Sequence, residues 1–235
     1  MNYVLSDLHG QYKKYRAMLE EIQFKSTDTL YVLGDVIDRG PDGCKILLDM
    51  ISRANVIPLL GNHELSASIC LPFLMKEVTE QSLEALDSTQ LAALNDWLLN
   101  GGGATLRELK QLHQWEREEI LEYIQEMELY AEVTAGSRDF VLVHAGLDRF
   151  FPKKPLDKYE LQDFLFGRPG LNATFFEDKY LVHGHTPTRL LLQEAGELPE
   201  DKIVCRGKKI SMDCGAAFGG RLGCLCLDTM EELYV

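Results

Sequence analysis

Apolar residues in the first sixty positions follow two different periods in turn. Two segments keep the period of a helix, with apolar residues at Tyr12, Tyr15, Leu19 and Ile22 and again at Cys44, Leu47, Leu48 and Ile51. Short continuous apolar runs at 3–5, 29–33 and 55–60 flank these segments and have the length of buried strands. This order predicts alternating strands and helices, and hence parallel strands that lie side by side.

A short polar block follows each of the three runs. The blocks are Asp7-Leu8-His9-Gly10, Gly34-Asp35-Val36-Ile37-Asp38-Arg39-Gly40 and Gly61-Asn62-His63-Glu64. Asp7 and Asp35 are 28 positions apart, and Asp35 and Asn62 are 27 apart, which is close to one strand-helix-strand unit each time. In open α/β sheets, ligands bind beyond the carboxyl ends of the parallel strands, so we expect the three blocks to form one site.

The donor atoms expected at that edge suit divalent metal ions. Asp7 and Asp35 offer carboxylates, His9 an imidazole and Asn62 an amide oxygen. This mixture of oxygen and nitrogen favours Mn, Fe, Zn or Co over Ca or Cu(I). Two ions roughly 3.5–4 Å apart need a bridging group, and a carboxylate has two oxygens for that task. We expect Asp35 to be the bridge.

The pattern changes after residue 75. Between 76 and 128 the chain is rich in Glu, Gln and Leu, which predicts a helical insertion over about 76–129 that breaks at Gly101-Gly102-Gly103. Strand-like runs return at 140–143, 180–182, 210–212, 222–227 and 233–235. Short connections in the last third predict a second sheet of mostly antiparallel strands. No linker divides the chain, so residues 1–235 are expected to form a single catalytic domain.

Composition narrows the classes of function. With 235 residues and 46% hydrophobic content, the chain can build one substantial core. The net charge of -13 argues against nucleic acid as a partner, because that binding draws on Lys and Arg. No run approaches the roughly 18 to 20 apolar residues of a membrane span, and Met1 leads into a strand instead of a basic signal region. We therefore expect a cytoplasmic protein without a membrane partner.

The six cysteines are scattered along the chain, and we expect them to be reduced thiols. Cys224 and Cys226 lie within an apolar run, which favours two strand side chains on one face over half of a zinc site. Among the remaining polar residues, His183 is expected to be packed core or to support a ligand, and Glu64 to orient a neighbour.

Taken together, the motifs resemble those of the calcineurin-like metallophosphoesterases, and within them the phosphoprotein phosphatase branch with its small bacterial and phage members. The resemblance rests on the three blocks above and on Val143-His144-Ala145-Gly146, Gly184-His185-Thr186-Pro187 and the segment 212–222. Several such blocks in one order are far more specific than any one alone. Many members of the superfamily have a second histidine where this chain has Pro187, and the phosphoprotein phosphatase branch lacks it too. The resemblance implies an α/β fold, a four-layer α/β/β/α sandwich.

The resemblance also implies a ligand set for two divalent ions. Asp7, His9 and Asp35 would hold one ion, and Asp35, Asn62, His144 and His185 the other. Mn is the expected metal, with Fe, Zn, Co and Ni as alternatives. A hydroxide bound to the two ions would attack phosphorus directly.

Further roles follow from the same resemblance. His63 would protonate the leaving oxygen while paired with Asp38, and a nearby carboxylate would keep its imidazole able to donate a proton. Arg39 and Arg168 would grip the phosphate oxygens, the latter on the match of Leu165-Phe166-Gly167-Arg168-Pro169. Asn62 and His63 would contact the substrate beside them.

We therefore expect a phosphoric monoester hydrolase acting on phosphoserine and phosphothreonine in a protein or peptide partner, with phosphotyrosine as a further option. Two alternatives stay open. One is a symmetrical bis(5'-nucleosyl)-tetraphosphatase, because diadenosine tetraphosphate hydrolases share the same blocks. The other is a phosphate-binding regulatory module without catalysis, against which the presence of both His63 and Asp38 weighs.

Overall fold

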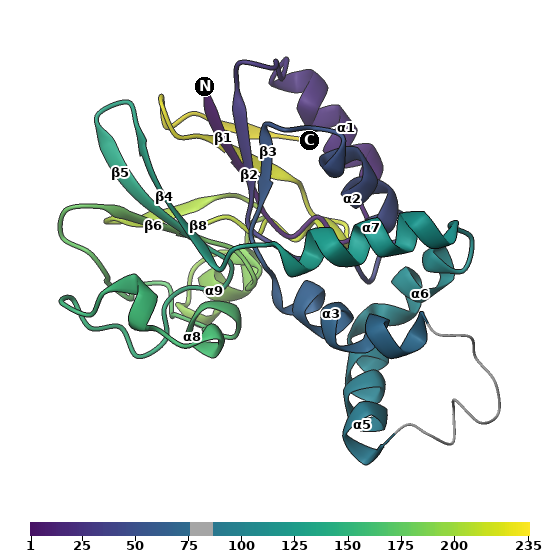
Figure 1. Ribbon diagram of the computed structural model, residues 1–235. Coiled ribbons are helices and arrows are strands. Elements are labelled where there is room, and N and C mark those ends of the chain that lie inside the picture. The colour runs from purple at the N-terminus through teal and green to yellow at the C-terminus, as the bar shows by residue number, and fades with distance from the viewer. Residues whose placement is uncertain (76–86) are drawn as a thin grey trace.

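The computed structural model describes residues 1–75 and 87–235. Two five-stranded sheets pack face to face, and helices lie on their outer sides (Figure 1). This arrangement is the predicted α/β/β/α sandwich, so the expected fold class is confirmed.

The first sheet has the strand order β10-β9-β1-β2-β3. Its strands are β1 (Asn2–Leu5), β2 (Thr29–Val32), β3 (Val56–Pro58), β9 (Gly223–Cys226) and β10 (Glu232–Tyr234). β1, β2 and β3 are parallel, and α1 (Tyr12–Glu21) and α2 (Gly43–Ile51) connect them, as the apolar pattern predicts. β9 pairs with β1 in the antiparallel direction, with Tyr3 opposite Cys226.

The second sheet has the order β4-β5-β6-β8-β7. Its strands are β4 (Tyr130–Ala135), β5 (Arg138–Val143), β6 (Tyr180–His183), β7 (Val204–Arg206) and β8 (Lys209–Ser211). The prediction of a mostly antiparallel sheet is wrong, because β5, β6 and β8 are parallel and only the outer strands β4 and β7 are antiparallel to their neighbours. The runs at 222–227 and 233–235, expected in this sheet, form β9 and β10 of the first.

The connections explain the difference. The chain between β5 and β6 contains η2 (Leu156–Lys158) and α8 (Leu161–Leu165), and α9 (Thr188–Glu194) and β7 lie between β6 and β8. Parallel neighbours need such long crossovers, whereas antiparallel neighbours can be joined by a tight turn.

The core lies in two layers on either side of the first sheet. Val4 points into the cluster between the sheets, with Phe140 and Val182 of the second sheet. Its neighbour Leu5 points the other way, into the cluster formed with α1 and α2, as the alternation of side chains along a strand requires. On the outer side of the second sheet, Leu191 of α9 packs with Val204 of β7 in a smaller cluster.

The described part of the predicted helical insertion is helical from 88 to 109 and again from 114 to 125, and α3 (Asn62–Leu74) precedes it. α5 (Ser88–Trp97) continues through a π-helical turn, η1 (Leu98–Gly102), into α6 (Gly103–Leu109), and α7 (Gln114–Gln125) follows. The predicted break is present, because Gly101 has a φ of 106°. The part of the prediction that concerns 76–86 lies outside the described residues.

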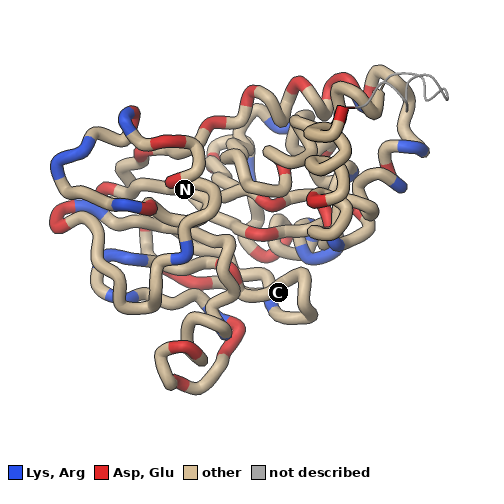
Figure 2. The backbone as a smooth tube through the Cα atoms, turned by 90° about the horizontal axis from the view of Figure 1, so that it is seen from below, with Lys and Arg blue, Asp and Glu red and all other residues tan. Residues whose placement is uncertain are grey.

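Three further observations bear on the surface and the cysteines. All six cysteines are free thiols, and Cys224 and Cys226 are buried in β9. Within the described residues, no helix has both the length and the apolar character needed to span a bilayer. Figure 2 shows Lys and Arg dispersed along the described chain among acidic residues instead of gathered in one stretch.

Candidate active site

The polar blocks meet where strands of both sheets end. Asp7 and His9 follow β1, Asp35 follows β2, and Asn62 begins α3 after β3. From the second sheet, His144 follows β5 and His185 follows β6. The two edges are joined directly, because His144 Nδ1 lies 2.7 Å from the carbonyl oxygen of Leu33.

Two groups of donor atoms flank Asp35. One comprises His9, Asp35 and His63, the other Asp35, His144 and His185, and within each group the donor atoms lie within 4.8 Å of one another. Asp35 Oδ2 is 3.5 Å from His9 Nε2, and Oδ1 is 3.4 Å from His144 Nε2. Each carboxylate oxygen therefore faces a different group, as a bridging ligand requires.

Hydrogen bonds fix which nitrogen each imidazole presents. His9 Nδ1 donates to the carbonyl oxygen of Ile37 at 2.9 Å, and His144 Nδ1 donates to that of Leu33. In both rings this leaves Nε2 without a proton and able to bind a metal, and such backbone partners are what orients metal-binding histidines in proteins. Asn62 Oδ1 lies 3.0 Å from His144 Nε2, so the amide oxygen joins the second group.

Asp7 lies at the same edge with different contacts. Its carboxylate accepts the backbone N–H of His185 at 3.0 Å from Oδ2 and also the hydroxyl of Ser6. These side chains fill the space beside Gly184, which leaves no room for a Cβ there. The first donor group contains His63 where the resemblance implies Asp7, so the role of Asp7 as a ligand stays a prediction.

The charges at this edge also fit divalent cations. Burial and the nearby carboxylates of Asp213 and Asp35 raise the pKa of Asp7, and burial is the main cause that raises the pKa of Asp213 to about 7. Burial lowers the pKa of His9 and of His185 to about 3, so both imidazoles are neutral and offer a lone pair. Cations would relieve the repulsion between the carboxylates, so donor atoms and charges agree.

The backbone is strained at these positions. Non-glycine residues with positive φ are uncommon and cost roughly 1–3 kcal/mol each. Asp35 has a φ of 53° and Asp38 a φ of 68°, and most other residues of this kind in the described chain also belong to the candidate site. The additional site residues with positive φ are Asp7, His9, Arg39 and His185. Strain that is concentrated in this way indicates that the loops are shaped for the site and not for stability alone.

His63 forms a buried pair with Asp38. His63 Nδ1 lies 2.7 Å from Asp38 Oδ2, and both side chains are almost completely buried. Burial by itself lowers the pKa of His63, but the hydrogen bond that its Nδ1 donates to Asp38 and the charge of Asp35 outweigh burial, and the pKa is raised. The predicted pairing is therefore present in the structure, and its effect on the imidazole has the sign that a proton donor needs.

Arg39 closes this side of the site. Its guanidinium donates to His9 Nε2 at 2.6 Å and to His63 Nε2 at 2.9 Å, and it lies over the ring of Phe218. A guanidinium only donates hydrogen bonds, so both rings present an unprotonated Nε2 to it here. The same planar fork could pair with two oxygens of a phosphate.

The sequence gives no sign of two further contacts to Asp38. Trp97 Nε1 donates to Asp38 Oδ2 at 2.8 Å, and the hydroxyl of Thr105 donates to Oδ1 at 2.5 Å. Both residues come from the helical segment, far from Asp38 along the chain. The glycine-rich break between them was the one local signal of an unusual backbone.

Comparison with known proteins agrees with this geometry. The model of the calcineurin-like phosphoesterase family matches residues 3–189. The chain belongs to this family. Within it, this chain is 35% identical over 100 residues, 41% of its own length and 37% of the relative, to a symmetrical bis(5'-nucleosyl)-tetraphosphatase of Wigglesworthia glossinidia brevipalpis. It is 31% identical over 147 residues, 62% of this chain and 43% of the relative, to an enzyme of the same name from Acidovorax ebreus (strain TPSY).

The chain thus spans about two fifths of the length of these curated relatives. A solved structure provisionally assigned as a diadenosine tetraphosphatase has a TM-score of 0.66 and 17% sequence identity, and the match covers 100% of this chain and 92% of the other. At that identity the likeness shows the fold alone. The relatives named above match the expected alternative better than the protein phosphatase that the motifs favoured.

Arg168 is exposed and follows α8. The backbone N–H of Ala145 donates to the carbonyl oxygen of Phe164, which ties this segment to the residue after His144. Burial is the main cause of the low pKa of His185, and the positive charge of Arg168 adds to it. The charge of Arg168 therefore acts on the second donor group, and its contact with phosphate stays a prediction.

His183 and His113 belong to neither of the two donor groups found among the described residues. His183 is fully buried, contacts the hydroxyl of Ser211 at 3.0 Å and has its pKa lowered by burial to about 3, as expected for a packed core residue. His113 is exposed at the start of α7.

Glu64 holds the loop that carries Asp35. It is fully buried, and its two oxygens accept the backbone N–H groups of Asp35 at 2.7 Å, Val36 at 2.8 Å, Ile37 at 3.1 Å and Gly61 at 3.2 Å. These bonds explain how the loop keeps Asp35 at a positive φ, and they agree with the expected orienting role.

We predict that Glu64→Gln destabilises the protein by about 2–3 kcal/mol, because an amide NH2 replaces an acceptor and leaves buried N–H groups without a partner. Urea unfolding at neutral pH measures the change. Glu116→Gln is the matched control, since Glu116 accepts one backbone N–H at the exposed start of α7 and its change should cost much less. Equal stability of the two variants would contradict the assigned role of Glu64.

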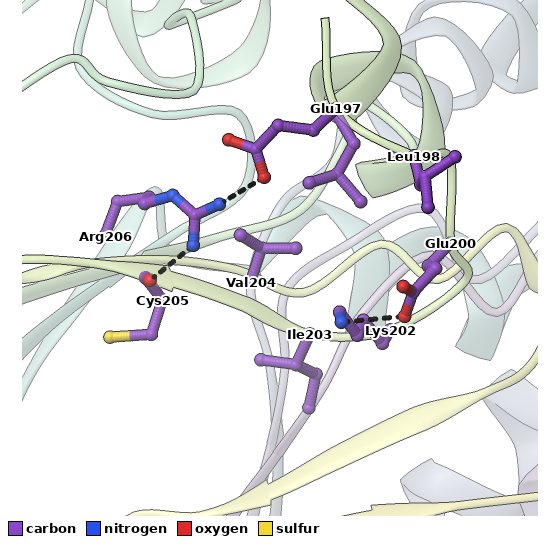
Figure 3. A pocket seen from close by; sticks show the side chains of 9 residues that line it. Glu197, Leu198, Glu200, Lys202, Ile203, Val204, Cys205 and Arg206 are labelled. Atoms are coloured by element: carbon purple, nitrogen blue, oxygen red, sulfur yellow. Dashed lines mark hydrogen bonds and ion pairs between the residues drawn. The ribbon is translucent and has the colours of Figure 1, made fainter. Parts of the chain in front are cut away.

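A separate hollow of about 380 Å³ lies beside β7 (Figure 3). Its lining includes Leu192, Val204 and an ion pair of 2.6 Å between Arg206 and Glu197. None of the site residues named above lines it, so it is not part of the candidate active site.

Proposed function

We propose that the protein is a metal-dependent phosphoesterase that hydrolyses dinucleoside tetraphosphates symmetrically, with residues 1–235 as one catalytic domain that includes a helical insertion at about 76–129. The reaction class rests on the geometry of Asp35, whose two oxygens face two separate donor groups. The substrate class rests on the curated relatives, which share the name of symmetrical bis(5'-nucleosyl)-tetraphosphatase.

The proposed metal ligands are those of the sequence analysis. Asp7, His9 and Asp35 would hold one divalent ion, Mn in the first instance, and Asp35, Asn62, His144 and His185 the other. When bound, the ions would supply positive charge and a water molecule of lowered pKa for attack on phosphorus.

Side chains of this protein would bind the phosphate oxygens and donate the proton. Arg39 and Arg168 would bind phosphate oxygens, and this would draw the guanidinium of Arg39 away from His63 Nε2. His63, whose pKa is raised, could then hold a proton on Nε2 and give it to the leaving oxygen as the phosphorus–oxygen bond breaks. Water attacks one of the two central phosphoryl groups, and the proton goes to the oxygen that leaves with the other. Cleavage at the centre of the tetraphosphate therefore gives two nucleoside diphosphates.

The test compares initial rates of the Mn-loaded protein on diadenosine tetraphosphate and on a phosphoserine or phosphothreonine peptide, with His63→Asn in parallel. We expect higher kcat/KM for the dinucleotide. A preference for the peptide would overturn the substrate assignment in favour of a protein phosphatase. Binding of either substrate without turnover would leave only the regulatory module.

A further inference from the structure

Asp38 has more partners than a simple histidine pair needs. Its carboxylate is fully buried and receives bonds from three helices: His63 of α3, Trp97 of α5 and Thr105 of α6. Trp97 and Thr105 are themselves 1% and 2% exposed, so no solvent competes for these bonds. The backbone N–H of Asp38 also donates to the Thr105 hydroxyl at 3.0 Å, which makes this contact reciprocal.

The path of the helical segment is what brings the two donors together. Trp97 and Thr105 are eight positions apart, and in an uninterrupted α-helix this spacing separates the residues by about 12 Å along the axis. Here both side chains reach one carboxylate, because the π-helical turn and Gly101 redirect the chain between α5 and α6.

The glycines at the turn fit this requirement closely. Gly101 accepts the backbone N–H of Arg39 at 3.2 Å, and a Cβ on Gly101 would lie 2.9 Å from Arg39 Cγ. A Cβ on Gly102 would lie 2.6 Å from the Trp97 ring. The break is therefore shaped around Asp38, Arg39 and Trp97 and is not simply a loose connection between helices.

The two carboxylate oxygens of Asp38 accept hydrogen bonds from different residues. Thr105 binds Oδ1, while Trp97 and His63 share Oδ2. Because hydrogen bonds hold both of its oxygens, the carboxylate of Asp38 cannot rotate about its bond to Cβ. Oδ2, which accepts the hydrogen bond from His63 Nδ1, therefore stays in one position. The direction of Nε2, the nitrogen that faces the site, is fixed through the same ring.

We propose that Trp97 and Thr105 are positioning residues for proton donation by His63, so that the helical segment 88–109 is part of the catalytic site. This inference rests on the role of His63 in the proposed function. It does not depend on which phosphate ester is the natural substrate.

The test uses variants that remove one donor and little volume: Trp97→Phe, Thr105→Val and, as the conservative rescue, Thr105→Ser. Trp115→Phe is the matched control, because Trp115 is 60% exposed on α7. For each Mn-loaded variant, kcat and KM are measured for an alkyl phosphate, a poor leaving group, and for 4-nitrophenyl phosphate, a good one. Bound metal is measured by elemental analysis.

For Trp97→Phe and Thr105→Val we expect kcat on the alkyl phosphate to fall by about 10- to 100-fold, the equivalent of one lost hydrogen bond to a charged group. The loss on 4-nitrophenyl phosphate should be much smaller, and KM and metal content should be unchanged. Thr105→Ser should restore most of the rate because it keeps the hydroxyl.

Three results would overturn the inference: no loss, an equal loss on both substrates, or a loss that follows the metal content. Trp97→Phe keeps the test decisive if Thr105→Val does not fold. His63→Asn, measured alongside, separates the two proposals. If the loss of kcat in His63→Asn depends on the leaving group but the losses in the Trp97 and Thr105 variants do not, only the positioning role of Trp97 and Thr105 is wrong. If the loss in His63→Asn is independent of the leaving group, the acid step of the proposed function is wrong.

Discussion

His63→Asn should lower kcat by about 100- to 10,000-fold on an alkyl phosphate while both metal ions stay bound, because general acid catalysis contributes about that factor to a poor leaving group. Asparagine keeps a polar group near Asp38, but it has no nitrogen that can give up a proton at neutral pH. On 4-nitrophenyl phosphate, whose leaving oxygen needs little protonation, the loss should be much smaller. Steady-state kinetics on the two substrates and elemental analysis of the variant measure these effects.

The matched control is His113→Asn, since His113 is exposed at the start of α7. Its kinetics should be those of the unchanged protein. An equal loss for both leaving groups in His63→Asn would argue against proton donation and in favour of a role in binding phosphate, which its position beside Arg39 would also permit.

Asp35→Asn should weaken binding of both ions and reduce activity by at least about 100-fold, the upper range for loss of a group that merely supports a metal ligand. The amide has one oxygen and no charge, whereas the geometry uses both carboxylate oxygens, one toward His9 and one toward His144. Isothermal titration with Mn and elemental analysis after dialysis measure the number of ions and their affinities.

Asp139→Asn serves as the control, because Asp139 is an exposed aspartate of β5 that bonds Thr134 at 2.6 Å. It should bind metal normally. If Asp35→Asn retained two tightly bound ions, Asp35 would not be the bridge and the two donor groups would have to act independently.

The parts of the site that local sequence could predict are those at strand ends. Asp35 and Asn62 follow apolar runs at a regular spacing, so the alternation of strands and helices is enough to place them together. The pairing of His63 with Asp38 was also expected, from the resemblance, and the structure places the two side chains in contact.

Trp97 and Thr105 were not predictable in this way. On a regular helix they would lie about 12 Å apart along the axis, and they converge on Asp38 because the chain is redirected at Gly101. Helical periodicity describes which side chains are buried, but it carries no information about the partner they are buried against. The glycine-rich break could be read as a hinge, whereas the structure shows it packed against Arg39.

The direction of strands in the second sheet was missed for a related reason. Short runs with short connections favour hairpins, and β7 with β8 is one, since Cys205 lies opposite Ile210. The connection from β6 to β8 passes through α9, a helix of seven residues that was too short to stand out by its period. The order and direction of strands depend on contacts between segments that are far apart along the chain, and these contacts cannot be predicted from the local pattern of a single sequence.

The pairing of β1 with β9 has a consequence for how this chain folds. Tyr3 is opposite Cys226, which lies 223 positions later, so β1 keeps an unpaired edge until β9 has been synthesised. Contacts between positions so far apart are slow to form, because a large loop must close before they contribute stability. A nascent chain that stops short of β9 would expose that edge to other chains, and we expect such ribosome-bound fragments to depend on chaperones until β9 and β10 emerge.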